Sequence, residues 1–249
     1  MSVTPKMPSR HHPVRRILKP IAALGIVVVS AVIIISVLHV RNSPIQVDTS
    51  VAAIDSASTI NDPAWFDKAY KDGFRLYILH STAWGTCQPW SNTYQQAKMA
   101  LDAGLKIAAY TRNPNCFKEG IEALGTLKDK LQFFALDIES DPGIPVTRAM
   151  IDGVRALGVR PVIYTGSGMW PTIMGSSNAF SDVPLWDTNT SKFAYNEWEI
   201  DYMHPAPLVY GGWNTTSTMR VGVQQQFEYT LNGIAVDLNS FDKSFLQER

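Results

Sequence analysis

Four acidic residues lie at the ends of short apolar segments, where they could act together on a substrate. The stretch FFALDIES ends with Asp137 and Glu139, which are two residues apart and therefore share one face of an extended strand. Asp55 closes AAID, and Asp237 lies in GIAVDL. Clustered carboxyls push one another's pKa values apart, so one can keep its proton while a neighbour is ionised. Glycoside hydrolysis requires such a pair, a proton donor and an anion.

A fold of alternating strands and helices would position these acids. Short apolar segments predict strands at 52–55, 74–79, 105–110, 131–138, 160–165, 183–187, 220–227 and 233–238. Helix-like segments follow only the first five strands; the first has Asp62 as its N-cap and Pro63 at its first position, and the third covers 115–130. Strands separated by helices are parallel. Eight strands, with helices after only the first five, predict an α/β fold, a TIM-like (β/α)5β3 barrel.

Barrel closure would bring the four acids together. In α/β barrels the carboxyl ends of the strands carry the chemistry. Asp55, Asp137 and Asp237 belong to the ends of the first, fourth and last strands, and closure puts the first and last strands side by side. We therefore expect these three carboxyls and that of Glu139, four in all, at one mouth of the barrel. The alternative for each acid is a solvated side chain or a helix cap.

An apolar N-terminal segment precedes this barrel. Ile21–Leu38 contains no charged residue, and at ~1.5 Å per residue it reaches about 27 Å, enough to span a bilayer. Residues 1–41 hold six of the 22 basic residues and no acid, so the basic end is expected to stay in the cytosol. The expected organisation is a cytosolic tail (1–20), a transmembrane signal anchor (21–40), a linker (41–50) and a barrel outside the cytoplasm (51–249). The alternative is a cleaved signal peptide and a secreted protein.

The charge of the barrel region limits its partners. Beyond residue 41, 16 bases face 22 acids, and an acidic domain is a poor candidate for binding nucleic acid. Clustered acids can bind divalent cations, but no stretch resembles a phosphate-binding loop or a calcium loop. We expect no metal and no cofactor, and a monomeric protein.

Cys87 and Cys116 are the only cysteines. In an exported domain such a pair indicates a disulfide, which would stabilise the fold by about 3–4 kcal/mol in the chain-entropy model. Two thiols that do not react with each other are the alternative.

The region from about residue 51 to residue 245 resembles glycoside hydrolase family 25, the muramidases that cut peptidoglycan. The resemblance rests on AAIDSAS, FFALDIES, GVRPVIYTG, VPLW and GIAVDLNSF, the last being a signature ending of that family. The family's barrel has five β/α units followed by three strands, in agreement with the segment count above.

The resemblance implies a role for each acid. Glu139 matches the general acid, and Asp137 matches the carboxylate that orients or stabilises the N-acetyl-assisted intermediate. Asp55 and Asp237 match two supporting acids. The implied reaction is cleavage of the β-1,4 bond between N-acetylmuramic acid and N-acetylglucosamine, without a metal. Peptidoglycan or a related cell-wall glycan is thus the expected partner.

Three departures from the family pattern fall in the floor that binds sugar. The run Tyr110–Arg112 replaces an aromatic-histidine-aromatic run, and Gln225–Phe227 reads Q-Q-F in place of W-Q-Y. Asp187 stands where a small apolar residue is usual. These changes bear on substrate preference more than on chemistry. His80 and Arg112 are candidates to replace the lost contacts.

Further candidates for binding substrate lie at the same mouth. Tyr110, Tyr164 and Trp186 end strands there, and aromatic faces stack on sugars. Gln226 and His80 complete the set. Packing in the barrel core is the alternative for each ring.

Two functions of different class remain open. The first is a membrane-tethered muramidase facing outward. The second is a barrel that binds cell-wall glycan with little or no turnover, which the altered floor residues favour. A chitinase-like enzyme is disfavoured, because such barrels have a further acid at the position of Ala135.

Overall fold

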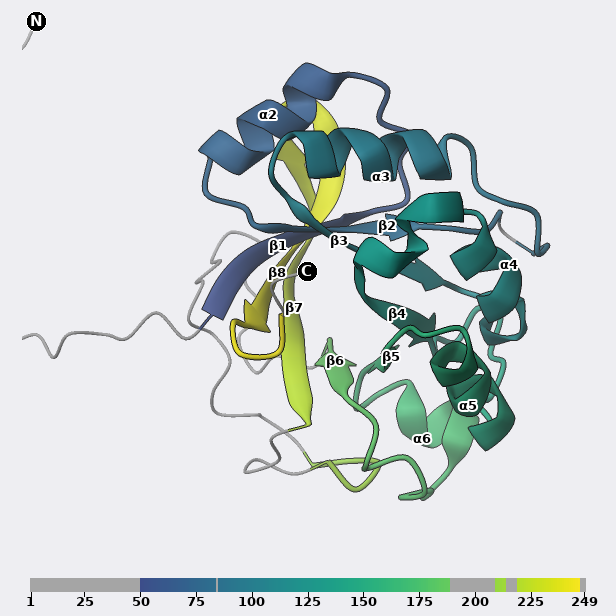
Figure 1. The fold of residues 1–249 in the computed structure, drawn as a ribbon. Coiled ribbons are helices and arrows are strands. Elements are labelled where there is room, and N and C mark those ends of the chain that lie inside the picture. The colour runs from purple at the N-terminus through teal and green to yellow at the C-terminus, as the bar shows by residue number, and fades with distance from the viewer. Residues whose placement is uncertain (1–49, 84, 189–208, 214–218, 247–249) are drawn as a thin grey trace, which may run out of the picture. The chain divides into compact units, whose positions relative to one another are not determined.

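The computed structural model describes residues 50–83, 85–188, 209–213 and 219–246, which form a closed eight-stranded barrel (Figure 1). The strands follow one another around the barrel in chain order, and β8 closes it against β1. They are β1 (Ser50–Ser56), β2 (Leu76–His80), β3 (Lys106–Thr111), β4 (Leu131–Asp137), β5 (Pro161–Thr165), β6 (Leu185–Asp187), β7 (Arg220–Leu231) and β8 (Ile234–Asp242). The predicted TIM-like barrel is confirmed.

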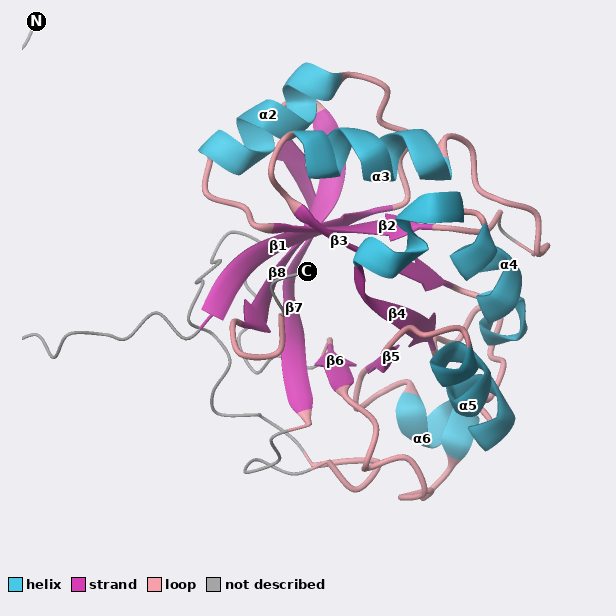
Figure 2. Ribbon diagram, viewed as in Figure 1, coloured by secondary structure: helices cyan, strands magenta, loops and turns pink. Residues whose placement is uncertain are grey.

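Helices follow each of the first five strands, as the sequence predicts. They are α2 (Pro63–Lys71), α3 (Thr93–Asp102), α4 (Phe117–Glu122), α5 (Arg148–Ala156) and α6 (Trp170–Met174). Strands β1 to β7 pair in parallel, whereas β8 is antiparallel to both β7 and β1. Figure 2 shows the helices ranged along β1 to β5, while the described residues of β6 to β8 carry none.

Local sequence signals determine where the first helix begins and ends. The Asp62 carboxylate accepts a hydrogen bond from the backbone N–H of Ala64 at 2.9 Å, and Pro63 occupies the first helical position. Gly73 follows the helix with a φ of +105°, a conformation that costs glycine little. The chain can therefore turn at once into β2.

The segment 115–130 differs from the single helix expected there. It contains a 3₁₀ turn at Pro114–Cys116, the short helix α4, and a second 3₁₀ turn at Gly125–Lys130. Gly125 has a φ of +53°, which interrupts the α-helical path. The crossover from β3 to β4 is therefore made of short pieces.

Alternation along the strands separates two apolar clusters. One fills the barrel interior, and the other lies between the barrel and its helices. In β4, Phe133 and Ala135 belong to the interior cluster, and Phe134 and Leu136 to the outer one. The same parity directs the next residue, Asp137, inward at the mouth of the barrel.

The N-terminal predictions fall outside the described residues. These are the cytosolic tail (1–20), the signal anchor (21–40) and the linker (41–50), apart from Ser50, which begins β1. In the part of the chain that the structure describes, no helix is both long and apolar enough to cross a membrane.

Candidate active site

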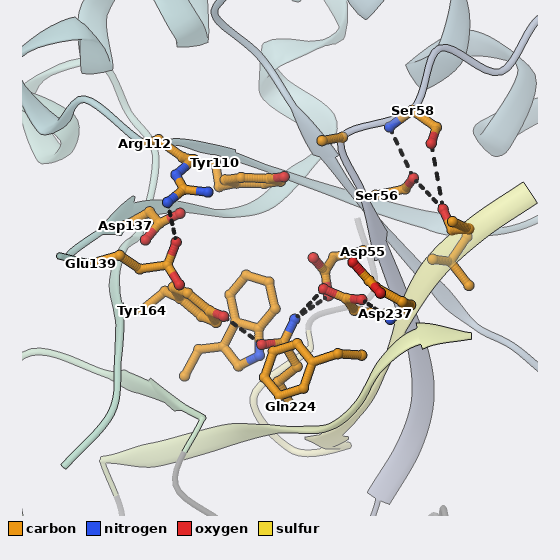
Figure 3. Close-up of a pocket in the computed structure, with 16 residues that line it drawn as sticks. Asp55, Ser56, Ser58, Tyr110, Arg112, Asp137, Glu139, Tyr164, Gln224 and Asp237 are labelled. Atoms are coloured by element: carbon orange, nitrogen blue, oxygen red, sulfur yellow. Dashed lines mark hydrogen bonds and ion pairs between the residues drawn. The ribbon is translucent and has the colours of Figure 1, made fainter. Parts of the chain in front are cut away.

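A pocket of about 580 Å³ lies at the carboxyl ends of the parallel strands. It brings together the four predicted acids, Asp55, Asp137, Glu139 and Asp237. Because β8 is antiparallel, Asp237 reaches this mouth from near the beginning of its strand and not from the carboxyl end expected from the sequence. Figure 3 shows Asp137 and Glu139 on one side of the pocket and Asp55 and Asp237 on the other. Residues from β1, β4 and β8 therefore meet at one mouth, although up to 182 positions separate them in the chain.

Barrel closure sets Asp55 beside Asp237, because the two are register partners in the antiparallel pair of β1 and β8. The Gln224 side-chain amide donates to Asp55 Oδ1 and to Asp237 Oδ2, both at 3.0 Å. Asn239 Nδ2 also donates to Asp55 Oδ1 at 2.7 Å, and the backbone N–H of Glu228 donates to Asp237 Oδ1 at 2.7 Å. Both carboxyls are thus held in fixed orientations by neutral donors.

Asp137 has a different environment. Its side chain is buried, and Oδ1 has no hydrogen-bond partner among the described residues. A buried oxygen without a donor is unfavourable unless something else supplies one. Asp137 therefore presents an acceptor to whatever occupies the pocket.

Glu139 lies two residues beyond Asp137, just past the end of β4. The chain remains extended there, because the Ile138 N–H donates to the Tyr164 carbonyl of β5 at 2.9 Å. Glu139 Oε2 lies 2.8 Å from a guanidinium nitrogen of Arg112, which follows β3 (Figure 3). An arginine thus contacts the acid that the sequence proposes as the proton donor.

Burial and mutual repulsion raise the pKa of all four acids. Burial is the largest cause for each of them, and the pKa of Asp237 rises to about 6. The charge of Asp237 further raises the pKa of Asp55, and the charge of Glu139 that of Asp137. Arg112 acts in the opposite direction on Glu139, whose pKa is still raised overall. The pocket therefore disfavours ionisation of all four carboxyls at the same time.

Three predicted aromatic residues, Tyr110, Tyr164 and Trp186, also line the pocket. Two of them join the polar network: Trp186 Nε1 donates to Asn239 Oδ1 at 2.8 Å, and the Tyr164 hydroxyl donates to Gln224 Oε1. All three rings also belong to the interior apolar cluster, so they pack in the barrel core and line the pocket at the same time.

His80 does not line this pocket but lines a second cavity that Arg112 also borders. It is buried at the end of β2, and its ring stacks on that of Tyr110 with 4.9 Å between centroids. Burial, with a smaller contribution from the charge of Arg112, lowers its pKa to about 4. His80 is therefore neutral near pH 7 and supports Tyr110.

Gln226 also lies outside this pocket, and Gln224 lines it instead. Between these residues the register of β7 on β8 shifts, so that two steps along β7 correspond to one step along β8. Such a bulge breaks the alternation of side chains, which is why Gln226 does not share the face of Gln224. Gln224 and Asn239 were not predicted as site residues, although Asn239 lies in the GIAVDLNSF segment two residues after Asp237.

Asp187, the third departure, lies outside the pocket as well. Its Oδ2 accepts from Arg220 Nε at 2.7 Å, and its Oδ1 accepts from the Tyr210 hydroxyl at 2.7 Å. The side chains of Asp187 and Arg220 are only 1% and 3% exposed. A buried ion pair thus joins β6 to β7.

The two cysteines form a disulfide between Cys87 and Cys116. It ties the loop after β2 to the segment after β3, close in sequence to Arg112. Within the described ranges, no group of three or more His, Cys, Asp or Glu side chains could hold a metal ion.

No family model and no curated protein sequence matches this chain. Solved structures do match it. A muramidase from Acremonium alcalophilum is 21% identical with a TM-score of 0.57, covering 78% of this chain and 95% of its own. A bacterial lysozyme from Streptomyces coelicolor (20%, TM-score 0.57, covering 79% and 94%) and a family GH25 lysozyme from Aspergillus fumigatus (20%, TM-score 0.55, covering 78% and 94%) also match. These similarities show that the barrel has the fold of those enzymes.

Proposed function

We propose that this protein is a glycoside hydrolase of the muramidase type, with Glu139 as general acid and Asp137 as the stabilising carboxylate. The observation that carries the proposal is the placement of Asp137 and Glu139 in one pocket. Burial raises the pKa of Glu139 there, as a proton donor requires. The fold shared with known muramidases and lysozymes supports the same assignment.

In this reaction Glu139 donates its proton to the glycosidic oxygen as the bond to C1 breaks, and the leaving sugar departs with a new hydroxyl. Positive charge develops at C1. Asp137, with an oxygen that accepts no hydrogen bond from the described residues, is suited to orient the N–H of a 2-acetamido group. The acetamido oxygen then bonds to C1, and water hydrolyses that intermediate with Glu139 acting as base.

The remaining groups of the pocket position the sugar. Asp55 and Asp237, fixed by Gln224 and Asn239, supply polar contacts, and their raised pKa values keep the total negative charge low. Aromatic rings such as Trp186 provide a face for the apolar side of a ring.

We propose peptidoglycan as the substrate, and the bond between N-acetylmuramic acid and N-acetylglucosamine as the one cut. The matched structures described above are a muramidase and two lysozymes, which supports this substrate. We further propose that residues 21–40 anchor the protein in a membrane with the barrel outside the cytoplasm. The apolar run and the basic residues before it support this placement.

A binding barrel without turnover is the second candidate, and one observation favours it. The Arg112 guanidinium 2.8 Å from Glu139 stabilises the ionised carboxylate, whereas a general acid must carry a proton. If this ion pair persisted in the complex, the site would hold glycan and not cut it.

Digestion of purified bacterial peptidoglycan by the full-length chain in a non-ionic detergent tests the proposal. New reducing ends would be identified by mass spectrometry, with Glu139→Gln as the matched isosteric variant and thermal unfolding as the control for folding. We expect fragments ending in reducing N-acetylmuramic acid, and a loss of about 10²–10⁴-fold in rate for the variant. Glycan retained on the protein with no new ends would establish the binding barrel instead.

A further inference from the structure

The pocket is strongly acidic and has one cationic side chain at its edge. Among the described residues that line it, the acids are Asp55, Asp137, Glu139, Glu228 and Asp237, and the base is Arg112. An anionic group on a ligand would meet carboxyls over most of this surface and a cation at one point. The position of Arg112 therefore decides where such a group can bind.

Arg112 is held in a contact that a ligand can replace. Its guanidinium is 2.8 Å from Glu139 Oε2 and donates to the backbone carbonyl of Asp141 at 2.7 Å. The Arg112 and Glu139 side chains are each 23% exposed, so water and solutes can reach the ion pair. Ion pairs in contact with solvent contribute about 0–1 kcal/mol, so exchanging one carboxylate for another costs little.

Arg112 also borders a second cavity, of about 240 Å³, next to the catalytic pocket. The other polar residues lining it include His80, Thr82, Asn113 and one acid, Asp141. His80 is neutral near pH 7, because its pKa lies at about 4. An anion that approaches Arg112 from this cavity thus meets one acid among the described residues, compared with five in the main pocket.

We propose that Arg112 determines specificity by binding a carboxylate carried on the glycan, which displaces Glu139 from the guanidinium. This inference rests on the proposed function and adds to it a residue that determines specificity, together with the substituent that this residue recognises. A planar guanidinium can bind a carboxylate through two parallel hydrogen bonds, so the substrate group can take the place of the Glu139 oxygen that Arg112 contacts. The substituent extends from the sugar in the main pocket toward the second cavity.

The exchange has a consequence for Glu139. In the ligand-free protein the charge of Arg112 opposes protonation of this carboxyl. A substrate carboxylate that neutralises Arg112 removes that opposition and leaves Glu139 able to take up the proton it must donate. A neutral glycan leaves the ion pair of Arg112 and Glu139 in place. Selectivity for carboxylated glycans therefore follows from the pairing.

Two sugars that differ by a single substituent test this inference. N-acetylmuramic acid is N-acetylglucosamine with a lactyl carboxylate on O3, and neither contains a bond to be cut. Dissociation constants for both would be measured by NMR titration of the full-length chain in detergent. We expect the wild type to bind the carboxylated sugar about tenfold more tightly, roughly 1.4 kcal/mol. In Arg112→Gln the preference falls below about twofold.

Two further variants distinguish the effect of the ion pair between Arg112 and Glu139 from the effect of the overall negative charge of the pocket. Glu139→Gln removes the competitor for Arg112, so the affinity for N-acetylmuramic acid rises several-fold while that for N-acetylglucosamine does not change. Glu228→Gln removes one negative charge from the same pocket at a residue with no ion pair to Arg112 among the described contacts, and a smaller rise is expected.

The outcomes distinguish this inference from the function on which it rests. Equal binding of both sugars by the wild type, or a preference that persists in Arg112→Gln, overturns the role of Arg112 and leaves the glycan site standing. Failure of both sugars to bind in the pocket overturns the two together. A tenfold preference that Arg112→Lys retains only in part supports the bidentate contact in particular, because lysine keeps the charge without the fork.

Discussion

Two arginine–carboxylate pairs lie at the strand ends of this barrel, and they differ in almost every other respect. The pair of Arg220 and Asp187 is at most 3% exposed, whereas Arg112 and Glu139 are each 23% exposed. Asp187 also accepts a hydrogen bond from Tyr210, so both of its oxygens have partners. The first pair is a closed unit between strands, and the second borders a pocket.

The difference in exposure between the two pairs follows from the alternation of inward and outward side chains along each strand. Asp187 follows Trp186, which points into the barrel, so Asp187 points outward. Asp137 follows Leu136, which belongs to the outer cluster, so Asp137 points inward. Acids at strand ends thus divide into those that join the barrel to its surroundings and those that face its mouth. Position at a strand end alone does not assign a function.

The comparison also shows what compensates each charge. Asp187 is neutralised by a buried guanidinium, while Asp55 and Asp237 have neutral amide donors and pKa values raised by burial. A carboxyl without a cation responds by holding its proton, which is what acid catalysis uses. Glu139 is an intermediate case, because it has a cation, Arg112, that a ligand can draw away from it.

The largest effect on stability is expected when the buried pair is broken. Arg220→Met leaves the Asp187 carboxylate buried without its cation, at a cost of about 3–5 kcal/mol in the free energy of unfolding. Arg112→Met is the matched control, and less than about 1 kcal/mol is expected because that pair is in contact with solvent. Urea unfolding of the three proteins measures both. Similar losses for the two variants would remove the distinction between the pairs.

A smaller effect should appear in the pH dependence of stability. The pKa of Asp237 is about 6 in the folded protein, above its ordinary value of about 4, so the folded state binds this proton more tightly. The stability from this group is therefore fully present below about pH 4 and is lost as the pH rises through 6.

Asp237→Asn removes this contribution, because asparagine does not titrate, together with the part of the Asp55 shift that the charge of Asp237 causes. The wild type should gain stability relative to the variant on acidification from pH 7 to pH 4, by on the order of 1 kcal/mol after allowance for partial exposure. Chemical denaturation at several pH values provides the comparison. A difference that stays constant with pH would mean that the carboxyl has an ordinary pKa.

Much of the barrel and of its acid cluster could be predicted from the sequence. Short apolar segments and helix signals such as Asp62 and Pro63 are local, and they predict the order of the elements. Parity and barrel closure then place Asp55, Asp137 and Asp237 at one mouth. These inferences need no knowledge of side-chain packing.

The polar contacts could not be predicted in the same way. Because of the bulge in β7, Gln224 lines the pocket in place of the predicted Gln226. The bulge depends on how two strands pair and not on either strand alone. The bond from Arg220 to Asp187 spans 33 positions, and it forms only after the barrel is assembled. Arg112 was singled out because it departs from a family pattern, but its contact with Glu139 required coordinates.

The most direct test of the account compares turnover by Glu139→Gln and Asp187→Asn, each per folded molecule, on peptidoglycan fragments. The account predicts a loss of about 10²–10⁴-fold for Glu139→Gln, and a loss below about tenfold for Asp187→Asn once its lower stability is allowed for. Wild-type turnover by Glu139→Gln, or equal loss in both variants, would contradict the assignment of the chemistry to the acids that face the pocket.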